Sequence, residues 1–314
     1  MRERKRELNF KIYIFMYHYV RPIKNSNYQN IKGLEFSEFK KQINFFKNSF
    51  NILSNESFVD ILNNKYLPKK DSILLTFDDG YKDHFDYVYP YLLKKKISAN
   101  FYPPINVIKK KEILNVNKIH FILEKNKNRD ELIQFIYSHI GNKKITDKIQ
   151  KIKLESRFDD KKTKLIKVLL QKFLPQKVRD EITSLLFKYV VNKNEKEFSK
   201  ELYVSLANLK EMFKDGMIIG SHTLKHPWLE TLSYEKQKKE IIGSIKFFEK
   251  NKILNKNFSV CYPYGSFNSN TIKILEKNKI HFALTTEFSY INSKNMKNIY
   301  KLPRYDANDF KNIC

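Results

Sequence analysis

A short apolar run that ends in two adjacent aspartates and a glycine limits the possible folds of this chain. Ile73-Leu74-Leu75 leads directly into Thr76-Phe77-Asp78-Asp79-Gly80. An uninterrupted apolar run of this length is typical of a strand buried on both faces, as in a parallel sheet. Two neighbouring carboxylates at its end repel each other unless a cation or a proton neutralises them. We therefore expect a buried strand that delivers two carboxylates to a cation-binding cavity.

The rest of the chain alternates between strand-like and helix-like segments. Strands are expected at 11–17, 72–77, 98–102, 217–219, 258–262 and 281–285, and helices at 35–50, 81–95, 205–214, 233–250 and 270–278. Pro90 lies inside one of these helices and predicts a kink or break there. Strands that alternate with helices indicate an α/β fold with a parallel sheet or barrel.

Residues 105–201 have a different character. Glycine is nearly absent, lysine is dense, and apolar residues such as Ile119, Phe121 and Ile122 recur at helical spacing. This pattern predicts a helical insertion that caps the active site or forms a partner surface. We expect 1–104 to form the first part of a barrel, 105–201 the insertion, and 202–314 the second part of the barrel.

Polar residues with catalytic chemistry follow four of the expected strands. These residues are His18, the Asp78-Asp79 pair, His222 and the segment 262–265. In a β/α barrel the carboxyl ends of the strands converge on one face, where catalytic residues collect. We therefore expect these distant segments to share one pocket.

His222 and His226 form the second half of a predicted metal site. Their spacing of four would place both imidazoles on one face of a helical turn, which Pro227 would keep short. Two imidazoles and the carboxylate of Asp79 leave a coordination position for water, which is the pattern of a catalytic site. Asp78 would then be available as a general base. The alternative is that one aspartate only caps a helix and that the histidines are ordinary polar residues.

Residues 76–80 and 222–227 together resemble the polysaccharide deacetylases, the NodB-type group of carbohydrate esterase family 4. Tyr17-His18-Tyr19-Val20 and Leu302-Pro303-Arg304-Tyr305-Asp306 are similar to segments of one branch of that group, which has an early Tyr-His motif. The similarity covers most of the chain outside 105–201. It implies a distorted (β/α) barrel, a bound divalent metal, and removal of an acetyl group from an N-acetylated sugar.

The resemblance also implies roles for individual residues. Asp78 matches the base, and Asp79, His222 and His226 match the metal ligands. Tyr264, in Tyr262-Pro263-Tyr264-Gly265, matches the position whose backbone N–H holds the oxyanion. We expect zinc as the ion, although cobalt, nickel or iron would suit the same ligands.

The sequence departs from the family pattern at two places. An arginine usually precedes the proline motif and orients the base, but Val260-Cys261 stands there, and Arg304 is the candidate replacement. A late Leu-x-His is also absent, and His18 is the candidate acid that protonates the leaving amine. Cys261 is expected to be a small buried residue.

Two further side chains have open roles. His84 is expected on the polar surface. Trp228 would either stack on a sugar or belong to the core.

The formal net charge of +26 invites comparison with nucleic-acid-binding proteins. The lysines are spread along the chain, so we expect a solvated surface and no nucleic-acid partner. Peripheral contact with an anionic membrane is the alternative. Cys261 and Cys314 make no disulfide framework, and no signal peptide or membrane span is recognised, so a cytoplasmic location is expected.

The sequence therefore predicts a metal-dependent N-deacetylase that acts on an N-acetylated glycan or glycan precursor, for example in surface-glycan assembly. One alternative is a deacylase or amidase acting on a non-sugar amide. Another is a non-catalytic carbohydrate-binding relative, favoured by the missing arginine and late histidine. No pattern specifies the sugar, its carrier or the oligomeric state.

Overall fold

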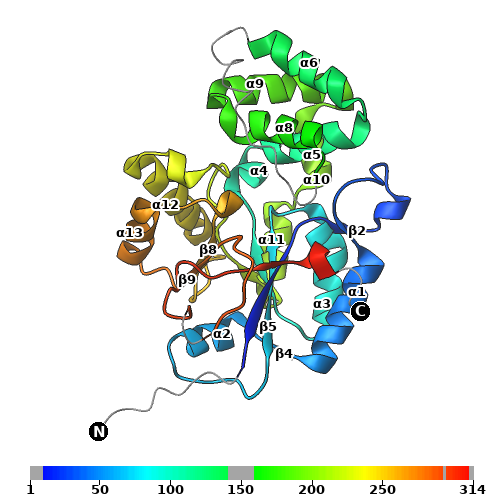
Figure 1. Cartoon of the computed structure of the whole chain (residues 1–314). Coiled ribbons are helices and arrows are strands. Elements are labelled where there is room, and N and C mark those ends of the chain that lie inside the picture. Colours follow the sequence, from blue (N-terminus) through cyan, green and yellow to red (C-terminus); the bar gives the residue numbers. More distant parts are fainter. Residues whose placement is uncertain (1–9, 141–158, 293–294, 311–314) are drawn as a thin grey trace. The chain divides into compact units, whose positions relative to one another are not determined.

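The computed structural model describes residues 10–140, 159–292 and 295–310 (Figure 1). The second cysteine, Cys314, lies outside these residues. Among the described helices, none combines the length and apolar composition that crossing a bilayer requires.

The chain divides into two compact units. The first comprises Met1–Pro22, Gly33–Lys111 and Lys200–Cys314, and the second comprises Ile23–Lys32 and Glu112–Ser199. The second unit thus includes a short N-terminal segment that lies outside the predicted insertion at 105–201.

A six-stranded parallel sheet forms the frame of the first unit. Its strands are β1 (Ile12–Tyr17), β4 (Asn51–Ile52), β5 (Ser72–Asp78), β6 (Asn100–Tyr102), β7 (Ile218–Ile219) and β10 (Tyr305–Asp306). They are ordered β10-β1-β5-β6-β7, and β4 pairs with the start of β5. The register places Ile12 beside Ser72 and Tyr17 beside Phe77, so β1 and β5 end together.

A second set of parallel strands contains two members. It consists of β8 (Ser259–Cys261) and β9 (Phe282–Leu284). Single parallel bridges link Ser221 to Val260 and Leu284 to Leu302, just before β10. Strands therefore follow one another around most of a barrel, without one continuous closed ladder in the described residues. The expected α/β fold with a parallel sheet is confirmed.

The buried strand β5 explains why its sequence is so apolar. All seven of its residues are buried. Ile73, Leu75 and Phe77 belong to one hydrophobic cluster and Leu74 to another, so successive side chains enter opposite layers. Each such side chain contributes about 1.5–3 kcal/mol on burial. The carboxylates at the end of β5 are thus carried by a strand anchored on both faces.

Helices cover the sheet, mostly where periodicity predicts them. They are α1 (Phe36–Ser49), α2 (Asn55–Leu62), α3 (Tyr89–Lys94), α4 (Ile105–Lys109), α11 (Leu206–Lys214), α12 (Tyr234–Lys250) and α13 (Ser269–Lys277). Among these, α2 was not predicted; the Ser54 hydroxyl caps it by accepting from the Ser57 N–H at 3.1 Å. Near Pro90, where a kink or break is predicted, a π-helical turn, η2 (His84–Val88), runs directly into α3, and Val88 and Tyr89 keep helical backbone angles.

The second unit is helical. It contains α5 (Asn115–Lys125), α6 (Arg129–Ile140), α8 (Lys161–Val168), η3 (Leu169–Phe173), α9 (Gln176–Leu186), η4 (Phe187–Val191) and most of α10 (Glu195–Leu202). Phe121 and Leu132 are fully buried in its core. Tyr28 belongs to the same core, since its ring packs edge-on against Phe121 at 4.7 Å.

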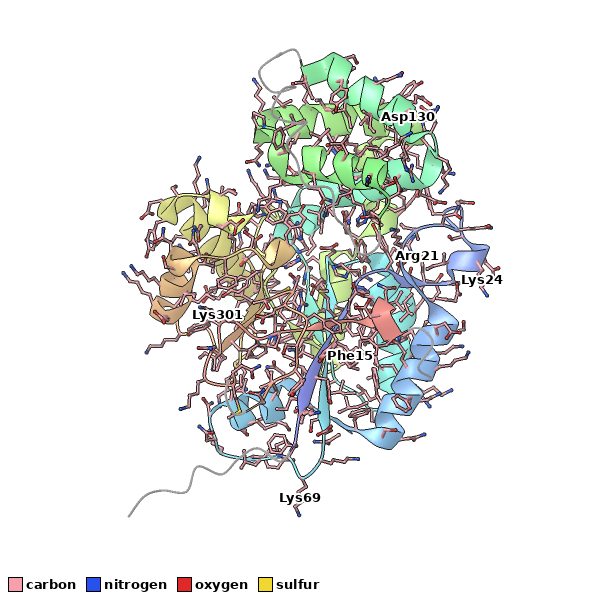
Figure 2. The ribbon with its side chains drawn as sticks, viewed as in Figure 1. Phe15, Arg21, Lys24, Lys69, Asp130 and Lys301 are labelled. Atoms are coloured by element: carbon pink, nitrogen blue, oxygen red, sulfur yellow. The ribbon has the colours of Figure 1, made fainter. Side chains whose placement is uncertain are left out.

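Lysine side chains such as Lys69 and Lys301 lie on the surface. Figure 2 shows Lys69 extending away from the first unit, and both Lys69 and Lys301 are exposed. Phe15, labelled in the same view, is only 5% exposed. The distribution fits the prediction of a solvated lysine surface.

Candidate active site and metal centre

The end of β5 turns sharply at the two aspartates. Asp79 and Gly80 both adopt left-handed backbone conformations, with φ of 67° at each. A Cβ on Gly80 would lie 2.7 Å from the Cβ of Pro103, so glycine is required here. Asp78 and Asp79 are 2% and 3% exposed. The turn therefore holds two buried carboxylates side by side, at a backbone cost of about 1–3 kcal/mol for the strained aspartate.

The two histidines lie on an irregular loop after β7, and the predicted helical turn is wrong. Thr223 and His226 adopt left-handed conformations, with φ of 66° and 60°. Pro227 disfavours helical geometry at the preceding residue. Glu240, on α12, accepts hydrogen bonds from the N–H groups of Leu224 (3.0 Å) and Lys225 (2.8 Å). These bonds replace those of a helix and fix the loop.

The loop brings both imidazoles to Asp79. Asp79 Oδ1 lies 3.6 Å from His222 Nε2 and 3.5 Å from His226 Nε2. These separations exceed ordinary hydrogen bonds. They are close to the edge of about 3.4 Å expected between ligand atoms of a tetrahedral ion with bonds of about 2.1 Å. The three side chains, all buried, have the spacing and chemistry of a metal site.

Neighbouring groups orient these three side chains. His222 Nδ1 lies 2.8 Å from the carbonyl oxygen of Cys261 and must donate to it, which leaves the lone pair of Nε2 toward Asp79. The Tyr81 hydroxyl donates to Asp79 Oδ2 at 2.6 Å. Burial lowers the pKa of His222, and it lowers the pKa of His226 to about 3. Both imidazoles are therefore neutral at pH 7, which is the form that binds a metal.

Arg304 pairs with the other carboxylate. It is 1% exposed, and its Nη1 and Nη2 donate to the two oxygens of Asp78 at 3.0 and 2.8 Å. Nε donates to the Thr285 carbonyl at 2.8 Å and fixes the guanidinium plane. Burial alone would raise the pKa of Asp78, but the charge and hydrogen bonds of Arg304 outweigh it and hold the pKa below its usual value. Asp78 is thus ionised and held in one orientation.

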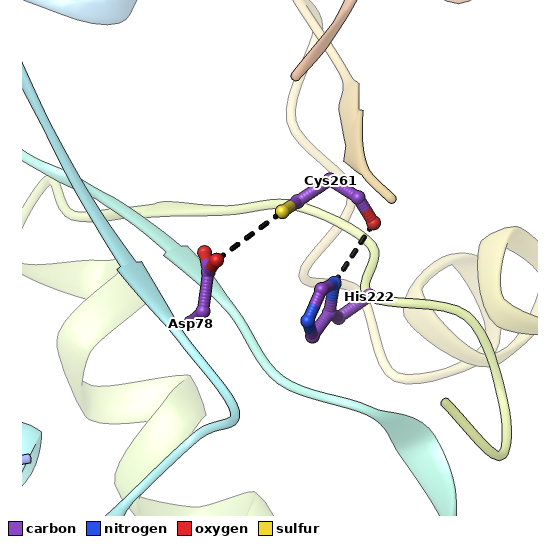
Figure 3. Close-up of side chains that lie close together, drawn as sticks. All are labelled: Asp78, His222 and Cys261. Carbon is purple, nitrogen blue, oxygen red and sulfur yellow. Dashed lines mark hydrogen bonds between the residues drawn. The ribbon is translucent and has the colours of Figure 1, made fainter. Parts of the chain in front are cut away.

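Cys261 lies between these groups. Figure 3 shows its thiol directed at Asp78 and its carbonyl at His222. The thiol is fully buried, lies 3.3 Å from Asp78 Oδ2, and accepts from Arg304 Nη2 at 3.0 Å. Burial raises its pKa well above the usual value, so it remains a thiol. The ligand atoms of Asp78, His222 and Cys261 also lie close enough together to hold a metal ion. The guanidinium of Arg304, which contacts the thiol, already places a positive charge at that position.

The predicted acid, His18, directly follows β1, and His84 of η2 lies beside its backbone. His18 is half-buried and lies near both Asp78 and Asp79. The predicted surface position of His84 is wrong. His84 is 1% exposed, and its Nε2 lies 2.7 Å from the carbonyl oxygen of His18. Its interior position arises because η2 turns this side chain toward Phe77 and Tyr81.

Tyr264 packs beside His226, one of the candidate metal ligands. It has a left-handed φ of 58°, and its ring packs edge-on against His226 at 4.6 Å. Trp228 stacks on it with the ring planes 4° apart and the centroids at 4.3 Å. Trp228 is half-buried and therefore adjoins the site rather than the core.

All predicted site residues thus gather in the first unit. Sequence reasoning missed Tyr81, which directly follows the aspartate motif, and Glu240, for which no local pattern exists. His281 directly precedes β9, at the opposite end of the strand from the site.

Comparisons with known proteins agree with this geometry. The polysaccharide deacetylase family model matches residues 65–126 and 158–283, more than half of the chain. The Bacillus subtilis (strain 168) protein named "Putative polysaccharide deacetylase YxkH" is 32% identical over 92 residues. That match spans 29% of this chain and 33% of the relative's length.

Two solved structures share the fold over nearly the whole chain. The Streptococcus pyogenes deacetylase PplD, in complex with acetate, has a TM-score of 0.58 at 20% identity and covers 94% of this chain and 92% of its own. A de-N-acetylase from Aggregatibacter actinomycetemcomitans has a TM-score of 0.56 at 16% identity, covering 94% of each chain. At these identities the likeness concerns the fold. With the family match and the Asp/His site, the conclusion is that this chain belongs to the polysaccharide deacetylase family.

Proposed function

We propose that this protein is a metal-dependent hydrolase that removes the acetyl group from an N-acetylated sugar. The supporting observation is the set of ligand atoms of Asp79, His222 and His226, beside an ionised Asp78. The donor set of one carboxylate and two neutral imidazoles suits zinc, and also cobalt, nickel or iron. Such an ion would polarise the acetyl carbonyl and lower the pKa of a water to about 7.

The chain's own residues supply the remaining chemistry. Asp78 accepts a proton from the water that attacks the acetyl carbon, and Arg304 keeps its carboxylate aimed. The N–H of Tyr264 donates to the oxyanion that develops on the carbonyl oxygen. His18 gives a proton to the sugar nitrogen as the C–N bond breaks. Acetate and a free amine are the products.

Elemental analysis and acetate release together test this proposal. The purified protein should hold about one divalent ion per chain and release acetate from N-acetylhexosamine oligomers, sugar nucleotides or lipid-linked sugars. Asp78→Asn should keep the ion and lose activity by about 100-fold or more, whereas Asp79→Ala should lose both.

The rival functions give different results. Release of another acyl group, with no acetate from any sugar, would favour a deacylase or amidase acting on a different amide. A metal-bearing protein that retains sugars but hydrolyses none would favour the non-catalytic binding relative. Full activity of Asp78→Asn would contradict the base assignment alone.

A further inference from the structure

His84 makes a contact that its burial alone does not require. Its Nε2 lies 2.7 Å from the carbonyl oxygen of His18. A carbonyl oxygen only accepts, so Nε2 carries the proton and donates. Phe77 and Phe101 surround the ring at 5.3 and 5.9 Å. The donor is therefore directed at the backbone of the residue proposed as the acid.

The other ring nitrogen indicates why a histidine stands here. Nδ1 of His84 is buried and has no hydrogen-bond partner among the described residues. Burying such an atom costs about 1–3 kcal/mol. An apolar side chain of similar size would fill the same aromatic pocket without that cost. The bond from Nε2 to the backbone of His18 is the gain that offsets it.

Two neighbours of His84 hold the same segment. Asp83 accepts from Nε of Arg21 at 2.6 Å, and both side chains are largely buried. Tyr81 stacks on Tyr19 with ring centroids 4.1 Å apart. The segment after the aspartate motif thus contacts the segment after β1 at three points, through Tyr81, Asp83 and His84. Of these points, the one formed by His84 lies on His18 itself.

We propose that His84 is a positioning residue for His18: its N–H fixes the backbone at the end of β1 and so aims the His18 imidazole at the leaving nitrogen. This inference rests on the proposed function, in which His18 protonates the departing amine. It requires no contact between His84 and the substrate.

Substrates with different leaving groups separate positioning from general damage. An amine must be protonated as it leaves, whereas the phenolate of an aryl acetate leaves without a proton. We therefore compare an N-acetylglucosamine oligomer with 4-nitrophenyl acetate, using His84→Leu, His84→Gln and His18→Ala. Glutamine can present an amide N–H near the position of Nε2, whereas leucine fills the pocket without a donor.

His84→Leu should lower kcat on the amide by about 10-fold or more while leaving aryl-ester hydrolysis and metal content within about 2-fold of the wild type. His84→Gln should recover most of the loss, and His18→Ala should show the same amide-selective defect. His281→Leu, at the far end of β9, is the control.

Equal losses on both substrates, or no loss on either, would overturn the inference. If His18→Ala leaves the ratio of amide to ester rates unchanged, the acid assignment in the proposed function fails, and the role of His84 fails with it. An amide-selective loss in His18→Ala that is absent in His84→Leu would overturn only the role of His84.

Discussion

The pairing of Arg304 with Asp78 defines the proposed base. Two parallel N–H···O bonds fix the carboxylate plane, and the lowered pKa keeps it ionised through the neutral range. Such an aspartate is unprotonated at neutral pH and can accept a proton, although its lowered pKa also makes it a weaker base. Its efficiency across the neutral range therefore depends on its position and not on its protonation state.

Arg304→Lys should expose that dependence. Lysine keeps the charge but cannot form the two parallel bonds, so the carboxylate can rotate. We expect kcat to fall by about 100-fold with unchanged metal content. Steady-state kinetics, with thermal melting to verify folding, would measure this. Arg129→Lys in the helical unit is the matched control, and an unchanged kcat in Arg304→Lys would contradict the orienting role.

The hydroxyl of Tyr81 donates a hydrogen bond to Asp79, the proposed metal ligand. A group that hydrogen-bonds to a metal-ligating side chain typically raises metal affinity by about 10–100-fold. Tyr81→Phe should therefore lower metal affinity by about 10–100-fold. Competition for the metal with a coloured chelator would measure this change. Tyr102→Phe removes an equally buried hydroxyl, bonded to Ser259 at 2.8 Å, and should leave affinity unchanged. Equal affinities for the two variants would show that the Tyr81 hydroxyl does not act on the metal.

At the scale of elements, the histidine loop depends on helix α12. Glu240 accepts two backbone N–H bonds from a loop that carries both imidazoles. Glu240→Ala should loosen both ligands together and lower metal affinity by about 10-fold, whereas Glu240→Gln keeps an acceptor and should recover most of it. Isothermal titration with zinc would measure this, and Glu235→Ala, near the start of the same helix, is the control. If Glu240→Ala binds zinc with wild-type affinity, the histidine loop keeps its conformation without the hydrogen bonds to Glu240.

The elements show what the sequence could and could not predict. Strand ends such as Asp78-Asp79 were predictable, because apolar runs fix strands and parallel strands end on one face. The loop at His222 was not, because spacing alone cannot separate a helical turn from a loop held by a distant carboxylate. The burial of His84 was missed for a similar reason, since a π-helical turn rotates the helix face that regular periodicity assigns.

At the scale of the whole molecule, buried neutral histidines make the metal-free protein sensitive to acid. Burial lowers the pKa of His84 to about 4, whereas an unfolded chain has a value of about 6.5. The unfolded state therefore binds the proton first. The stability contributed by neutral His84 is present above about pH 6.5 and is lost as the pH falls toward 4, by about 3 kcal/mol in total.

Denaturant unfolding at several pH values, with chelator present, would measure this loss. His84→Gln has no titrating group at this position and should lose about 3 kcal/mol less between pH 7 and pH 4 than the wild type. His222 and His226 remain in both proteins, so the difference isolates His84. Parallel stability profiles would contradict the assignment of a buried neutral imidazole.

The order of synthesis gives the Arg304–Asp78 pair a further consequence. The two residues are 226 positions apart, so a ribosome adding about 5–20 residues per second synthesises Asp78 about 10–45 s before Arg304. Until then, enclosing the ionised carboxylate would cost several kcal/mol. We expect the pocket to assemble only after translation passes Arg304. Stalled nascent chains that end before Arg304 should remain protease-sensitive around Asp78. Chains with an added C-terminal linker long enough to bring Arg304 out of the ribosomal tunnel should become resistant.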